Sequence, residues 1–139
     1  MKKQRGVTLM ELMIAVVVAG ILAAIAIPSY TSYIARGKIA EVTAALSEGK
    51  VRMEQNFNSL RSYYDSTGKC PTLTGLFSDT SFTIGVACND TTFTLTATGS
   101  KSMSGYTFTI NESGAKTSKT PTASDLLCWA KSKEQTSCP

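Results

Sequence analysis

The feature that most constrains this chain of 139 residues is an apolar run near its start. Residues 12–27 contain no charged side chain, and Lys2, Lys3 and Arg5 precede them. As a helix rising ~1.5 Å per residue, residues 7–30 would extend about 36 Å, enough to cross a hydrocarbon core of roughly 30 Å. Basic residues ahead of such a segment hold the N-terminus in the cytoplasm. The run therefore predicts a single-pass anchor with the rest of the chain outside the cytoplasm.

Glu11 is the one charged residue inside this anchor. An unpaired carboxylate at mid-helix in lipid costs on the order of 2.5 to 3.5 kcal/mol on insertion scales, so Glu11 is predicted to have a cationic partner. No Lys or Arg lies between Val7 and Arg36. Cleavage between Gly6 and Val7 would create a suitable amine and would remove the basic residues ahead of it.

The motif GVTLMEL at residues 6–12, followed by GILAAIAIPSY at residues 20–30, resembles the class III leader and N-terminal helix of type IV pilins. The resemblance implies that a prepilin peptidase/methyltransferase cuts after Gly6 and N-methylates Val7. It also implies that Glu11 acts in assembly, by pairing with the N-terminal amine of a neighbouring subunit. Pro28 removes a backbone hydrogen-bond donor and is predicted to kink the helix. The implied partners are other pilin subunits and an inner-membrane assembly platform. Val7 and Met10 depart from the usual residues of the motif, but both remain apolar.

An ordinary secretory signal peptide is the alternative interpretation of the same segment. The basic start, the apolar run and the small residues Ala24 and Ala26 fit that template. Glu11 fits it poorly, and the apolar run exceeds the roughly 7 to 15 residues of such signals. The mature chain would begin at Ile27 on this alternative and at Val7 on the pilin interpretation.

Charge and composition argue against several functions. The formal net charge is +4, but removing the three basic leader residues from fourteen leaves eleven against ten acidic residues. Attraction to nucleic acid is therefore not indicated by the charge balance. The chain has no histidine, its aspartates are scattered, and no glycine-rich phosphate loop follows a predicted strand. We expect neither an enzyme nor a cofactor.

Four cysteines, Cys70, Cys88, Cys128 and Cys138, all lie in the part predicted to be exported. An even set of cysteines in an oxidising compartment predicts two disulfides. Zinc is the competing use, but the gaps of 18, 40 and 10 positions differ from the short spacing of paired zinc ligands, so no metal is expected. Three pairings are possible. Cys70 with Cys88 and Cys128 with Cys138 is favoured, since each pair brackets one compact segment.

Past Pro28 the pattern predicts that the helix continues. Apolar residues recur at steps of three, four and once seven, which traces one face of an amphipathic helix. These positions are Ala35, Ile39, Val42, Leu46, Met53, Phe57, Leu60 and Tyr64. The predicted divisions are therefore a leader at 1–6, an apolar helix at 7–30, an amphipathic half at 31–64 and a head at 65–139.

The head alternates apolar and polar residues in three stretches, at 82–88, 93–97 and 106–110, with a fourth segment at 115–119. Period two with one apolar face predicts half-buried antiparallel strands. A small antiparallel sheet packed on the long helix is an α+β roll. The tail from Thr120 is predicted to be tied down by the last cysteine pair, with Trp129 packed nearby.

The arrangement is more similar to the minor pilins than to many major ones. The resemblance implies an inner-membrane protein that enters an extracellular pilus and supports pilus assembly, adhesion or twitching motility. Three alternatives remain open: a pseudopilin of a type II secretion system, a major pilin, and an anchored binding module that does not polymerise. Glu11 argues against the last of these.

Overall fold

The computed structural model describes residues 6–138; the leader residues Lys2, Lys3 and Arg5 lie outside that range. The chain divides into two compact units, one ending at Ile34 and the other beginning at Ala35. Helix α1, Leu9–Leu60, belongs to both and includes Pro28.

The N-terminal unit is the apolar part of α1. Its large side chains are exposed, among them Leu9, Ile14 and Ile25. The helix is long and apolar enough to cross a membrane. An apolar helix surface without protein around it needs lipid or another helix to cover it.

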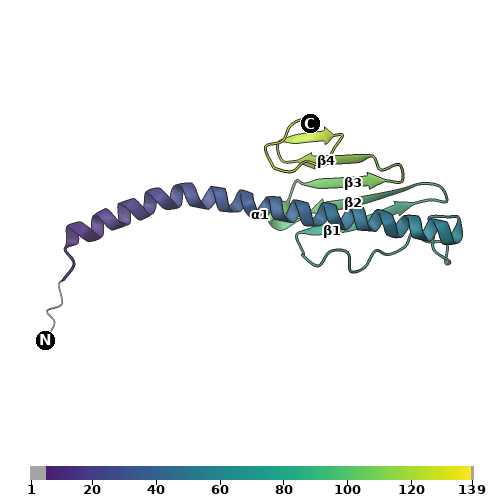
Figure 1. Cartoon of the computed structure of the whole chain (residues 1–139), viewed down its shortest axis with the longest axis horizontal. Coiled ribbons are helices and arrows are strands. Elements are labelled where there is room, and N and C mark those ends of the chain that lie inside the picture. The colour runs from purple at the N-terminus through teal and green to yellow at the C-terminus, as the bar shows by residue number, and fades with distance from the viewer. Residues whose placement is uncertain (1–5, 139) are drawn as a thin grey trace. The chain divides into compact units, whose positions relative to one another are not determined.

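The second unit packs the rest of α1 against a five-stranded antiparallel sheet (Figure 1). The strands are β1 Phe82–Cys88, β2 Phe93–Gly99, β3 Thr107–Asn111, β4 Lys116–Thr120 and β5 Ala123–Leu126, in spatial order β1-β2-β3-β4-β5. A short 3-10 helix, η1 Lys101–Met103, lies between β2 and β3. Each strand thus pairs with its neighbour in sequence. The predicted α+β fold is confirmed.

The core forms where the helix meets the sheet. Val42, Leu46 and Met53 are fully buried on α1 and belong to one cluster with Leu95 and Phe108 of the sheet. Inward residues of β2 and β3 lie opposite one another, as in the pair Ala97 and Phe108. These residues come from the apolar positions that the two periodicities predicted.

Two details of the predicted elements differ from the structure. The helix ends at Leu60, short of the predicted Tyr64, and Arg61 adopts a left-handed backbone conformation with φ of 57°. Tyr63 is then buried against Phe93 with ring centroids 4.8 Å apart. The strand β5 was not predicted, because its sequence Ala-Ser-Asp-Leu has too few apolar residues to show alternation.

The loop between α1 and β1 is held by one disulfide and a set of polar contacts. The disulfide joins Cys70 to Cys88 at the end of β1. Farther along the loop, Asp79 Oδ2 lies 3.1 Å from Lys38 Nζ of α1. Both hydrogen bonds from Ser81, through its backbone N–H and its hydroxyl, go to the same Asp79 carboxylate. The loop is therefore fixed to the helix on one side and to the sheet on the other.

Candidate assembly site and ligand-binding surface

The start of α1 contains the residues singled out for processing and assembly. Gly6 and Val7 precede the helix, and Thr8 is its N-cap: the Thr8 hydroxyl accepts the backbone N–H of Glu11 at 3.2 Å. A Thr followed three positions later by Glu is the pattern of a capping box. Within residues 6–138, none of the ion pairs involves Glu11, which is exposed.

The tail is organised around Trp129, the single tryptophan of the chain. The indole Nε1 donates a hydrogen bond of 2.7 Å to the carbonyl of Thr109 on β3. The Lys116 ammonium of β4 lies 4.4 Å from the ring centroid, within the range of a cation–π interaction. Trp129 is half-buried and packs against the hydrophobic core. Two adjacent strands therefore fix the indole.

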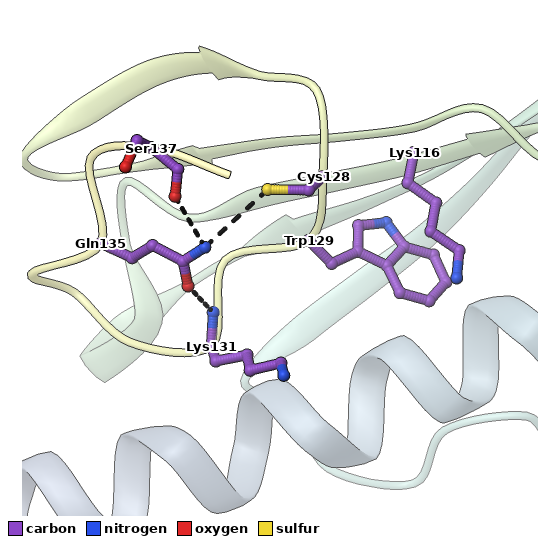
Figure 2. Close-up of a pocket in the computed structure, with 6 residues that line it drawn as sticks. All are labelled: Lys116, Cys128, Trp129, Lys131, Gln135 and Ser137. Atoms are coloured by element: carbon purple, nitrogen blue, oxygen red, sulfur yellow. Dashed lines mark hydrogen bonds between the residues drawn. The ribbon is translucent and has the colours of Figure 1, made fainter. Parts of the chain in front are cut away.

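A disulfide between Cys128 and Cys138 closes a loop that includes Trp129. Inside this loop the Gln135 side chain bridges three points, as Figure 2 shows. Its Oε1 accepts the backbone N–H of Lys131 at 2.9 Å, and its Nε2 donates to the Ser137 carbonyl at 3.0 Å and lies 3.8 Å from Cys128 Sγ. The amide of Gln135 is therefore used to shape the loop. The two disulfides join the pairs that the sequence favoured.

Two open cavities border Trp129. One, of about 540 Å³, is lined by Lys116, Cys128, Trp129, Lys131, Gln135 and Ser137. The other, of about 410 Å³, lies between the same segment and α1 and is lined by Arg36, Ile39, Ala40, Thr43, Trp129, Ala130 and Lys131. Trp129 and Lys131 are common to both. We call the four residues Arg36, Lys116, Trp129 and Lys131 the Trp129 surface.

The Trp129 surface combines an indole with three exposed cations from three separate parts of the chain. Arg36 comes from α1, Lys116 from β4 and Lys131 from the tail. None of these three cations takes part in an ion pair among the described residues. Sequence reasoning missed this cluster, because the three residues lie far apart along the chain and the overall charge is nearly balanced.

Two carboxylates of the head have lowered pKa values. The hydroxyl of Ser81, and then the Lys38 ammonium, lower the pKa of Asp79. Hydrogen bonds from Thr67 and Lys69 lower the pKa of Asp65 in the loop after α1. Each shift has a structural cause, a hydrogen-bonded loop, so neither carboxylate indicates catalysis. Within the described residues, no group of three His, Cys, Asp or Glu residues is arranged to hold a metal ion.

An exposed apolar N-terminal helix, a capped Thr-x-x-Glu motif and a disulfide-bonded sheet define a pilin-type subunit. A family model described as "Type IV minor pilin ComP, DNA uptake sequence receptor" matches residues 28–128. A second, the prokaryotic N-terminal methylation motif, matches residues 1–27. The chain therefore belongs to the type IV pilins, in the minor pilin family of ComP, and the predicted resemblance is confirmed.

Individual relatives agree with this family. The chain is 34% identical to Fimbrial protein Q of Moraxella bovis over 114 residues, which cover 82% of this chain and 62% of that protein. It is 35% identical to the type IV major alpha-pilin of Moraxella bovis over 91 residues, 66% of this chain and 52% of that pilin. The type IV major fimbrial protein FimA of Dichelobacter nodosus is 53% identical over 53 residues, 38% of this chain and 33% of FimA. The chain thus spans less than two thirds of the length of each.

Proposed function

We propose that this pilin is cut after Gly6, N-methylated at Val7 and assembled into the pilus as a minor subunit whose head binds DNA at the Trp129 surface. In this proposal the N-terminus begins in the cytoplasm and the head lies in the periplasm. Other pilins, the prepilin peptidase and the inner-membrane assembly platform are its protein partners. Its role is to form part of the pilus and to bind DNA, and it is not catalytic.

The N-terminal part of the proposal is supported by Glu11, which forms no ion pair among residues 6–138. Its carboxylate has no cation within the apolar segment, and an unpaired charge in lipid or in a packed helix bundle is costly. A methylated amine at Val7 keeps its positive charge and could come from a neighbouring subunit. Cleavage after Gly6 supplies this amine while removing the basic leader.

The DNA-binding part rests on one observation, the three cations grouped around Trp129. Phosphate contacts from Lys and Arg supply most of the sequence-independent affinity of proteins for DNA. Since Arg36, Lys116 and Lys131 form no ion pairs among the described residues, their charges remain available to a polyanion. The description of the matching family as a DNA uptake sequence receptor supports the same ligand class.

A pseudopilin of a type II secretion system is the second candidate. Pseudopilins share the leader and the N-terminal helix, but they usually stabilise their C-terminal region with calcium. The disulfide between Cys128 and Cys138, in the same region, favours the pilus.

The test of DNA binding is a titration of the full chain, solubilised in detergent, with a fluorescent duplex at several salt concentrations. Lys131→Ala is expected to weaken binding and to reduce the slope of log affinity against log salt by about 1, the effect of losing one phosphate contact. Lys119→Ala is the matched control, because Lys119 is exposed on β4 but lines neither cavity. Equal effects of the two variants, or no binding by the wild type, would contradict DNA binding at this surface.

A further inference from the structure

Ser118 is a buried hydroxyl of β4, on the face of the sheet where β2 and β3 present apolar side chains to the core. It is 3% exposed, on β4, and lies opposite Phe108 of β3 and Leu126 of β5. The inward positions of the neighbouring strand are apolar, as at Phe108 and Ile110. A hydroxyl at such a position is costly unless it is fully hydrogen-bonded. Its partners should therefore explain why it is there.

Both partners of Ser118 flank Trp129. The Ser118 hydroxyl donates to the carbonyl of Cys128 at 2.7 Å and accepts the backbone N–H of Ala130 at 3.0 Å. Ala130 is completely buried. One side chain thus satisfies the backbone on both sides of the tryptophan and sets where its main chain lies.

The disulfide between Cys128 and Cys138 also restrains the main chain next to Trp129. The remaining restraints act only on the ring. They are the hydrogen bond from Nε1 to Thr109 and the stacking of Lys116 over the indole. The Gln135 contacts shape the loop beyond Lys131 and do not touch Trp129. Without the Ser118 hydroxyl, the Cys128 carbonyl and the Ala130 N–H would lose their hydrogen-bonding partner in a buried place, and the segment would have to move to reach another one.

We propose that Ser118 is a positioning residue for the Trp129 surface. By hydrogen bonding to the backbone on either side of Trp129, it holds the indole between Lys116 and Lys131. The inference rests on the proposed function for its ligand, DNA, but the placement of the indole is measurable without any ligand. Ser118 lies beneath the surface and acts on the ligand only through Trp129.

Thr120 provides a matched control on the same strand. It is 2% exposed, and its hydroxyl accepts the backbone N–H groups of Thr122 and Ala123 at 3.3 and 3.1 Å. It therefore serves the turn between β4 and β5 instead of the tryptophan segment. Ser118→Ala and Thr120→Val each remove one buried hydroxyl, and a purely structural role predicts the same consequences for both.

The experiment compares these two variants as full chains in detergent. Because Trp129 is the single tryptophan, its emission maximum and its quenching by acrylamide report on this position alone. We expect Ser118→Ala to shift the emission to longer wavelength and to increase quenching, and Thr120→Val to leave both unchanged. Binding of the fluorescent duplex should become about tenfold weaker in Ser118→Ala only, the size of losing one good contact. Its salt slope should stay that of the wild type, because the cations remain.

The outcomes separate the two proposals. Unchanged emission and quenching in Ser118→Ala, equal changes in both variants, or loss of folding in Ser118→Ala alone would overturn the positioning role and assign Ser118 to general stability. Ser118→Thr retains the hydroxyl, so a folded Thr variant that behaves like the Ala variant would also contradict it. If the wild type binds no DNA while Ser118→Ala still shifts the emission, the DNA proposal fails and the positioning of Trp129 by Ser118 stands.

Discussion

A Cβ atom on Gly49 of α1 would lie 2.9 Å from Leu95 Cδ1 of β2. Gly49 is buried, and the side chains of Leu73 and Leu76 would lie at 3.1 Å from the same atom. The helix therefore lies close to the side chains of Leu95, Leu73 and Leu76 at this glycine. A glycine inside a helix costs about 1 kcal/mol relative to alanine. The close contact explains why it is present.

Gly49→Ala should therefore destabilise the head. Overpacking a core typically costs about 1 to 3 kcal/mol, which outweighs the gain in helix propensity. Gly37→Ala is the control, because nothing lies within 4 Å of a Cβ at that position on the same helix. It should raise the free energy of unfolding by up to about 1 kcal/mol. Urea unfolding of both variants in detergent tests these two predictions. Stabilisation by Gly49→Ala would contradict the first, because it would show that the neighbouring leucine side chains move aside at little cost.

The contact between Lys38 and Asp79 predicts a contribution to stability that depends on pH. The pKa of Asp79 is lowered in the folded state by Ser81 and Lys38, so folding favours its ionised form. That contribution is fully present above the unfolded pKa, near 3.8, and is lost as pH falls through the lower folded pKa. Asp79→Asn should lower the thermal midpoint at pH 7 and have a diminishing effect below pH of about 4. An effect of constant size from pH 7 to pH 3 would contradict this account.

The disulfide between Cys128 and Cys138 is expected to stabilise the tail and the Trp129 surface. Loss of a native disulfide in a small secreted domain costs about 2 to 5 kcal/mol. Replacing both cysteines by serine should lower the free energy of unfolding within that range and weaken DNA binding through Lys131. The variant with Cys70 and Cys88 replaced is the control, since it should lose stability while retaining the salt slope of DNA binding. Four free thiols in the purified wild type would refute the disulfides themselves.

Glu11→Val tests the assembly role proposed for that carboxylate. The variant should insert into the membrane, because valine is more apolar, and should still be cut after Gly6. Removing one partner of a buried ion pair leaves the other charge unpaired, at a cost of about 3 to 5 kcal/mol. When tagged variant and wild type are expressed together at equal level, the ratio of variant to wild type should therefore be lower in sheared filaments than in membranes. Equal incorporation would favour the alternative of an anchored binding module that does not polymerise.

The fold was predictable where the buried residues of an element recur at a regular spacing in the sequence. Ile39, Val42 and Leu46 follow the helical period, and Phe93, Leu95 and Ala97 alternate, so both elements and their buried faces follow directly. The strand β5 escaped prediction, since short edge strands need few apolar residues. The N-terminal motif was predictable because it is contiguous.

The Trp129 surface was not predictable for the opposite reason. Arg36, Lys116 and Lys131 meet only after β4 and the tail are placed beside α1. The net charge of the whole chain conceals a local group of cations, because acidic residues elsewhere in the chain offset them. Ser118 likewise has the appearance of a strand residue until its contacts at Cys128 and Ala130 are known. Contacts between residues distant in sequence, rather than composition, define this part of the molecule.

The most direct test of the account is the mass of the N-terminal peptide from this subunit in sheared, washed pili. We expect the subunit to be present in the filaments and its chain to begin with N-methylated Val7. A chain that begins at Ile27 or still includes Lys2, Lys3 and Arg5, or a subunit found in membranes but absent from the filaments, would contradict it.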